Sequence, residues 1–258
     1  MAIKFTHQPG LVAYITCGDP SLEVSRDVAL AAIEAGADVI ELGVPFSDPV
    51  ADGPVIQRAS ERALAQGTDL AGVIDVASQV RQRSRASLII FSYLNPILQF
   101  GLDNFCQAAK NAGVDGVLVT DLPVEEAHDY LRAMKTHKLA PVFLAAPTSP
   151  DERLRSVAKY SKGFVYAISR TGITGTCQEV AGDAQSLVQR LRALTKLPIA
   201  VGFGVSNAEQ FQQVGQFADA VVIGSAIVQL IENSAGHEAE AVSEFLKGLR
   251  AVEVTASH

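Results

Sequence analysis

Short runs of apolar residues recur along the chain, separated by stretches in which apolar residues have helical spacing. Eight such runs occupy residues 11–17, 38–43, 87–93, 115–120, 141–146, 163–169, 198–204 and 219–224. They are rich in Val, Ile and Leu without polar alternation, which is typical of parallel strands buried on both faces. One intervening stretch has the apolar stripe of a helix at Leu70, Val73, Ile74, Ala77 and Val80. The pattern predicts strands that alternate with helices.

Three junctions between a helical stretch and the next apolar run look alike. They read EAGADVIELG, NAGVDGVLVT and QFADAVVIGS, and each passes through small residues and an aspartate into a strand. This repetition indicates a recurring helix–strand unit. Eight strands with intervening helices in 258 residues predict one (β/α)8 barrel domain over residues 1–258. A doubly wound open sheet is the alternative, but CGDP after the first run lacks its Gly-rich fingerprint.

Two helix starts have a recognisable capping pattern. Ser149 is the predicted N-cap of one helix, and Ser206 is the predicted N-cap of another. A glutamate follows each serine three residues later, as in a capping box.

Composition narrows the range of functions. The net charge is −7 and the basic residues form no long block, which argues against nucleic acid and anionic membranes as partners. No apolar run is long enough to span a bilayer, and the first ten residues lack the pattern of a secretory signal. The three cysteines and five histidines are scattered, so neither a disulfide framework nor a metal site is expected. We expect a cytoplasmic protein, or a stromal one if it is made in a plastid.

Two carboxylates are candidates for proton transfer. Glu41 ends the second predicted strand, at the end of a barrel where active sites lie, and burial there would raise its pKa toward neutral. Its alternative role is an ion pair or a solvent-exposed strand end. Asp52 follows on a loop stiffened by three prolines, which can fold back over the same mouth. Its alternative role is structural, because Asp52 or Gly53 could cap a helix that begins at Pro54.

The last two predicted strands end in small residues that suit an anion. Gly202 and Gly204 follow the seventh strand, while Gly224 and Ser225 follow the eighth and begin a short helical pattern. Barrels often bind phosphate there, at a helix N-terminus, although such glycines also serve simple turns. After the sixth strand, the polar stretch 169–183 is either a surface loop or a lid that closes over substrate.

The chain resembles the tryptophan synthase alpha subunit family over nearly its whole length. The matching stretches, in family order, are YITCGDP, AGADVIELGVPFSDPVADGPVIQ, SYLNPI, GVLVTDLP, SRTGITG, VGFGVS and VIGSAIV. The second is the most specific. The resemblance implies a (β/α)8 barrel that cleaves indole-3-glycerol phosphate to indole and glyceraldehyde 3-phosphate, a carbon–carbon lyase reaction. It also implies a beta subunit partner in an alpha2beta2 complex, which carries pyridoxal phosphate and uses the indole, with no cofactor in this chain.

The resemblance also assigns roles to individual residues. Glu41 would be the acid and base that protonates indole C3 and handles the glycerol hydroxyl proton, and Asp52 would accept a hydrogen bond from the indole N–H. The residues implied in substrate or phosphate binding are Tyr166, Thr174, Gly175, Gly202, Phe203, Gly204, Gly224 and Ser225. The proline loop and SYLNPI would form partner surface. One departure is visible, because only ten residues precede the first strand where the family usually has a fuller helix that plugs the barrel bottom.

Other functions remain open at this point. A stand-alone indole-3-glycerol phosphate lyase would have the same site and differ only in activity without a partner. A catalytically idle barrel that activates a beta subunit is disfavoured by the presence of both Glu41 and Asp52. An unrelated phosphosugar isomerase on the same fold lacks support from the second-strand motif.

Overall fold

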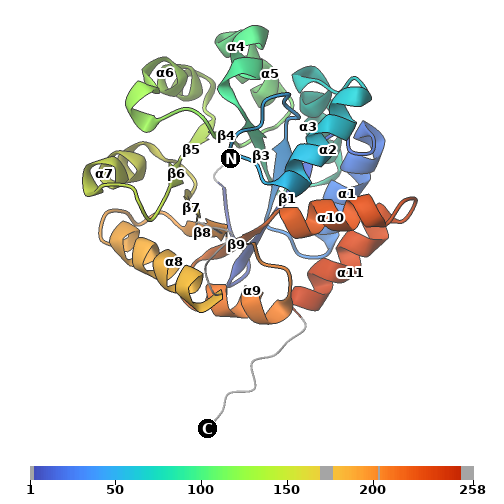
Figure 1. The fold of residues 1–258 in the computed structure, drawn as a ribbon. Coiled ribbons are helices and arrows are strands. Elements are labelled where there is room, and N and C mark those ends of the chain that lie inside the picture. Colours follow the sequence, from blue (N-terminus) through green and yellow to red (C-terminus); the bar gives the residue numbers. More distant parts are fainter. Residues whose placement is uncertain (1–2, 169–176, 203, 251–258) are drawn as a thin grey trace.

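The predicted barrel is confirmed by a computed structural model, which describes residues 3–168, 177–202 and 204–250 (Figure 1). Its strands are all parallel and form one sheet in the order β5-β4-β3-β2-β1-β9-β8-β7-β6. The bounds are β1 Gly10–Thr16, β2 Val39–Gly43, β3 Ser87–Ser92, β4 Gly116–Val119, β5 Ala140–Val142, β6 Leu144–Ala145, β7 Val165–Ile168, β8 Ile199–Gly202 and β9 Ala220–Ile223.

The nine strands correspond to the eight predicted ones. Only Phe143 separates β5 from β6, so both belong to the run predicted at 141–146. The amide of Tyr166 donates to the Phe143 carbonyl at 3.2 Å, which joins this pass of the chain to the next. The ring therefore contains eight passes, as a (β/α)8 barrel requires.

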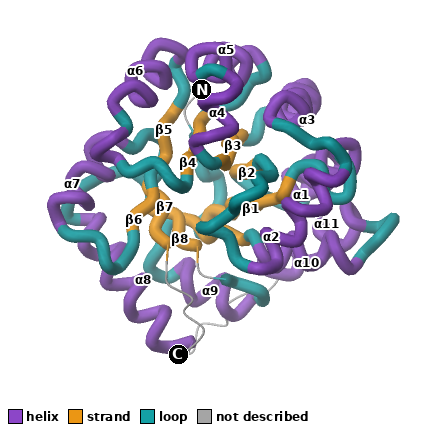
Figure 2. The backbone as a smooth tube through the Cα atoms, turned by 45° about the horizontal axis from the view of Figure 1, so that its top comes forward, coloured by secondary structure: helices purple, strands orange, loops and turns teal. Residues whose placement is uncertain are grey.

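The helices surround the strands on all sides (Figure 2). Their bounds are α1 Leu22–Glu34, α2 Pro54–Ala65, α3 Leu70–Arg83, α4 Leu94–Phe100, α5 Leu102–Asn111, α6 His128–His137, α7 Asp151–Tyr160, α8 Cys177–Arg192, α9 Ala208–Gly215, α10 Ser225–Asn233 and α11 Glu238–Arg250, with a 3-10 turn at Val124–Glu126. Across the described part of the chain, no helix has the length and apolar character needed to cross a membrane.

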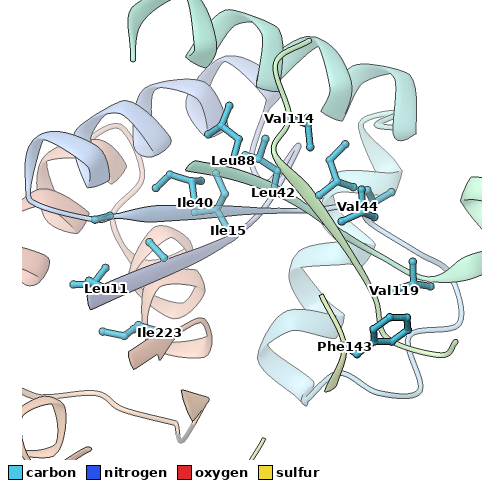
Figure 3. Packing of buried hydrophobic residues seen from close by; sticks show 14 of the residues in the cluster. Leu11, Ile15, Ile40, Leu42, Val44, Leu88, Val114, Val119, Phe143 and Ile223 are labelled. Carbon is cyan, nitrogen blue, oxygen red and sulfur yellow. The ribbon is translucent and has the colours of Figure 1, made fainter. Parts of the chain in front are cut away.

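The apolar core has two layers because successive strand residues point to opposite faces. The outer layer lies between strands and helices, and Figure 3 shows part of it, including Ile40, Leu42 and Leu88. The inner layer fills the barrel itself with Val12, Val39, Ile89, Leu118, Val142, Phe164, Ala200, Ala220 and Val222. Glu41 alternates with Ile40 and Leu42, so it belongs to the inner face.

The three aspartates of the repeated junctions have one shared structural role. Each precedes a strand and accepts a hydrogen bond from a backbone amide of the strand beside it. Asp38 accepts from Leu11 at 2.9 Å, Asp115 accepts from Leu88 at 3.0 Å, and Asp219 accepts from Ile199 at 2.7 Å. These bonds hold the strand starts in register.

Residues 3–9 close the bottom of the barrel without a helix. Ile3 is only 6% exposed and joins the inner layer, with Phe5 packed against it. The Ile3 side chain lies against Gly116 and Gly163, where any Cβ atom would press on it. The described part of the N-terminal segment thus supplies apolar side chains where the family resemblance implies a helix.

Asp38 fastens this segment to the barrel. It accepts hydrogen bonds from the Thr6 amide at 2.8 Å and the Thr6 hydroxyl at 2.6 Å, and it lies 2.9 Å from His7 Nδ1. Burial alone would raise the pKa of Asp38, but the hydrogen bonds from Thr6, Leu11 and His7 outweigh it and lower the pKa. Because a lowered pKa means that the folded state favours the ionised form, this contribution to stability is lost as the pH falls through the folded-state pKa.

Both predicted capping serines are wrong. The N-cap of α7 is Pro150, and the Ser149 hydroxyl instead accepts from the Ala146 amide at 3.1 Å. The N-cap of α9 is Asn207, whose side chain accepts from the Gln210 amide at 2.9 Å. Gln210 in turn accepts from the amide of Ser206, the residue before the cap, so the cap lies one residue later than predicted.

Residues 3–9, which plug the barrel bottom, lead to a test of stability. Replacing Ile3 by Ala should lower the free energy of unfolding by about 2–4 kcal/mol, because it empties a filled position in the inner layer. Urea unfolding followed by circular dichroism measures the change. Lys4→Ala is the control, since its side chain is exposed and should change stability by less than about 0.5 kcal/mol. Equal stability of Ile3→Ala and wild type would show that the plug does not contribute.

Candidate active site

Glu41 is buried inside the barrel without a counter-charge. Its side chain is fully buried, and neither carboxylate oxygen has a hydrogen-bond partner within the described residues. In the sheet register it lies beside Tyr14 of β1 and Ile89 of β3. Burial raises the pKa of Glu41 to about 8. The ion-paired or solvent-exposed alternative is therefore wrong, and the carboxyl group is protonated at neutral pH.

Asp52 reaches the same end of the barrel on the loop after β2. Tyr93 holds it there, donating from its hydroxyl to Asp52 Oδ2 at 3.1 Å and accepting from the Ala51 amide at 3.0 Å. Phe46 packs on the Tyr93 ring, with centroids 5.0 Å apart. Burial raises the pKa of Asp52 to about 6, and the bond from Tyr93 limits the rise. Gly53, not Asp52, is the N-cap of α2, and no side chain caps that helix.

A cavity of about 310 Å³ opens over this mouth. Asp52, Tyr166, Gly202, Gly204, Gly224 and Ser225 line it. Glu41 itself does not line the cavity. However, Tyr14 and Tyr166 both line it, and the pKa of each is raised by burial and further by the charges of Glu41 and Asp52. The two phenols are therefore close to both the cavity and the buried acid.

Tyr14 and Tyr93 are site residues that the sequence analysis missed. Tyr14 alternates with the interior residue Val12, so strand periodicity alone could have placed it in the mouth. Tyr93 belongs to SYLNPI, which the resemblance assigns only to partner surface. The bond from Tyr93 to Asp52 spans 41 residues, and nothing local in the sequence signals it.

Two glycines make room for the tyrosines. A Cβ atom on Gly43 would collide with the Tyr14 hydroxyl, and one on Gly202 would lie 2.9 Å from the Tyr166 hydroxyl. Gly202 therefore has a packing role beside its predicted place in an anion site.

The N-terminus of α10 faces the cavity. Ser225 is the first residue of this helix and Gly224 is its N-cap, and both line the cavity. The first amides of an α-helix have no partner within the helix and carry partial positive charge, which suits an anion. Gly204 also lines the cavity and has φ +67°, a conformation that favours glycine.

An ion-pair network holds α2 and α10 in place beside the cavity. Arg62 of α2 makes two bonds of 2.8 and 2.7 Å to Asp19, which is buried in the loop after β1. The same guanidinium bonds Glu232 of α10 at 2.7 Å, and Arg58 bonds Glu232 at 3.1 Å. These bonds thus connect the loop after β1 with both helices.

Three predicted residues and most of the predicted lid lie outside the described residues. These residues are Thr174, Gly175 and Phe203. The predicted loop 169–183 is too long, because residues 177–183 belong to α8. Over the described ranges, no group of three His, Cys, Asp or Glu residues could hold a metal ion.

Comparison with known proteins agrees with this geometry. A family model described as tryptophan synthase alpha chain matches residues 1–256. The chain belongs to the tryptophan synthase alpha chain family. It is 51% identical to the tryptophan synthase alpha chain of Solibacter usitatus (strain Ellin6076) over 233 residues, covering 90% of this chain and 87% of the relative. Over 252 residues it is 47% identical to that of Burkholderia thailandensis, covering 97% and 93%.

Solved structures of the family have the same fold. Tryptophan synthase subunit alpha from Legionella pneumophila str. Paris superimposes with a TM-score of 0.86 at 37% identity, covering 94% of this chain and 91% of that one. A chain of tryptophan synthase from M. tuberculosis gives 0.86 at 34% identity, covering 95% and 92%. Membership of the tryptophan synthase alpha chain family makes this chain an enzyme subunit, and these matches give the stand-alone lyase no support.

The pKa of Glu41 predicts an unusual dependence of stability on pH. The pKa of Glu41 is about 8 in the folded state, against an ordinary value of 4.5 for glutamate, so between these pH values the folded state binds more protons than the unfolded state. Stability therefore falls as the pH rises through this window. The free energy of unfolding of wild type minus that of Glu41→Gln should fall by up to about 1.4 kcal/mol per pH unit. Urea unfolding at several pH values measures this difference, and a constant difference would contradict the raised pKa.

Proposed function

We propose that this chain cleaves indole-3-glycerol phosphate to indole and glyceraldehyde 3-phosphate, as the lyase subunit of tryptophan synthase. The observation that carries the proposal is the unpaired acid Glu41 beneath a cavity that also contains Asp52 and the N-terminus of α10. Carbon–carbon cleavage of this substrate needs a proton at indole C3, stabilised charge at the indole nitrogen, and removal of an alcohol proton. Glu41 suits the two proton transfers, Asp52 suits the charge at the indole nitrogen, and the N-terminus of α10 suits the phosphate.

Glu41 is the proposed general acid and base. With a pKa of about 8 it holds a transferable proton at neutral pH, which it gives to indole C3, and its carboxylate then takes the glycerol hydroxyl proton. No hydrogen bond holds either carboxylate oxygen, so a change of rotamer toward the cavity breaks no bond. Tyr14 and Tyr166 flank its path.

Asp52 is the proposed partner of the indole N–H. At neutral pH a group with a pKa of about 6 is mostly ionised, so it accepts a hydrogen bond and stabilises positive charge on the protonated indole. The bond from Tyr93 orients it for this role. The two carboxyl groups therefore divide the work because their environments differ.

The phosphate is proposed to bind between Gly204 and the start of α10. Ser225 supplies a hydroxyl, and the first amides of α10 supply donors and partial positive charge. Among the described residues that line the cavity, none is Lys or Arg. Backbone amides and one hydroxyl can thus bind an anion in an acidic protein.

We also propose a beta subunit partner in an alpha2beta2 complex in the cytoplasm, with pyridoxal phosphate held by the partner and no cofactor in this chain. The segments expected to meet the partner contain exposed apolar side chains. Val50 in the loop after β2 is 87% exposed and Leu98 of α4 is 55% exposed, the two highest values for large apolar residues in the described ranges. Tyr93, the N-cap of α4, joins that loop to the helix through its bond from the Ala51 amide.

Glu41→Gln tests the function directly. The variant keeps the size of the side chain but removes the transferable proton, so indole release should fall by at least about 100-fold. Release of indole from indole-3-glycerol phosphate is measured with and without a beta subunit. Glu61→Gln is the control, because Glu61 lies on α2 away from the cavity lining, and its activity should stay near wild type. Near-normal turnover by Glu41→Gln would refute the role of Glu41.

Ser225→Asp tests the phosphate site without harming the helix. An acidic residue in the first turn stabilises a helix but repels a phosphate bound there. Affinity for indole propanol phosphate, measured by calorimetry, should fall at least tenfold. Ser225→Asn is the neutral control of similar size and should lose much less. If both variants bind equally, the phosphate does not lie at α10.

A further inference from the structure

A second cavity lies at the other end of the barrel, between the C-terminal ends of α6 and α7. Its volume is about 440 Å³. Leu131, Met134, Pro141 and the ring of Tyr160 contribute an apolar floor. The cavity also takes in residues that precede β5 and β7, so it opens at the N-terminal ends of the strands, away from Asp52 and Ser225.

Four lysines surround this floor, and no acidic residue is among the described residues that line it. They are Lys135, Lys138, Lys159 and Lys162. The chain has eight lysines and a net charge of −7, so half of its lysines gather at one cavity of an acidic protein. All four are exposed, and none has an ion-pair partner in the described part of the chain.

Favourable interaction with the helix ends explains only part of this cluster. Lys135 and Lys159 lie in the last turns of α6 and α7, where a cation is stabilised by the helix dipole. Lys162 lies beyond the end of α7 and gains little from that effect. Four like charges around one cavity repel each other, so a bound anion relieves an existing cost.

We propose that this cavity binds a small organic anion with a flat apolar body, such as an aromatic carboxylate or sulfonate. The apolar body would lie on the floor against Tyr160, and the anionic group would meet the ammonium groups of the rim. The volume is in the range of small-molecule sites. An apolar surface with four ammonium groups around it suits a ligand that is apolar at one end and anionic at the other. The cavity is bounded by two helix ends, which suits one ring system better than a protein segment.

Anilinonaphthalene sulfonate is the probe, with the neutral N-phenyl naphthylamine as its uncharged counterpart. The chain has no tryptophan, so indole emission does not interfere with the fluorescence titration. In the full-length double variant Lys159→Glu/Lys162→Glu, the sulfonate should bind at least tenfold more weakly while the neutral probe changes less than threefold. Tyr160→Ala should weaken both probes, because it removes part of the floor.

A matched control separates the cavity from net charge. Lys196→Glu/Lys247→Glu makes the same change in charge at two exposed lysines outside the cavity, and its affinity for the sulfonate should stay within twofold of wild type. Equal weakening in both double variants, or none in either, would overturn the proposal. So would self-association of wild type in gel filtration that Lys159→Glu/Lys162→Glu abolishes, because the surface would then bind a second copy. Circular dichroism confirms that each variant is folded.

Discussion

Strand register is the constraint on which the rest of this structure depends. In a parallel barrel, a shift of one residue moves every side chain of a strand to the other face. Asp38, Asp115 and Asp219 each tie the start of a strand to its neighbour through a backbone amide. With that register fixed, Val39 and Glu41 face the interior while Ile40 and Leu42 face the helices. The acid is therefore buried because the strand cannot slip.

The burial of Glu41 explains the arrangement of the residues around it. A charge inside an apolar barrel is costly, so Glu41 keeps its proton and the cost is reduced. Tyr14 and Tyr166 line the cavity close to it, and Gly43 and Gly202 leave the space that their hydroxyl groups need. Asp52 lies nearer the solvent, and its pKa rises less. A difference in depth thus gives two carboxyl groups different protonation states at the same pH.

The barrel could be predicted from the sequence because each strand repeats a local pattern of apolar residues, small residues and an aspartate. Glu41 could be placed for the same reason, since strand position and alternation are local. The capping serines were misplaced because Ser, Asn and Pro compete for a cap within two residues, and side-chain bonds such as that of Asn207 decide between them. Tyr93 could not be assigned to Asp52, because their contact depends on the folded path of the proline loop. The cluster of four lysines could not be predicted from the sequence either, because only the fold places the ends of α6 and α7 around one cavity.

The plug at the barrel bottom also orders events during synthesis. Ile3 packs against Gly116 and Gly163, which are made more than a hundred residues later. The interior that receives Ile3 includes Phe164 just before β7, Ala200 of β8 and Val222 of β9. Contacts between such distant positions are non-local, and the cost of closing the loop must be met before they form, so they form late. Residues 3–9 can therefore complete their packing only after β9 has been made, and their docking closes the bottom of the barrel.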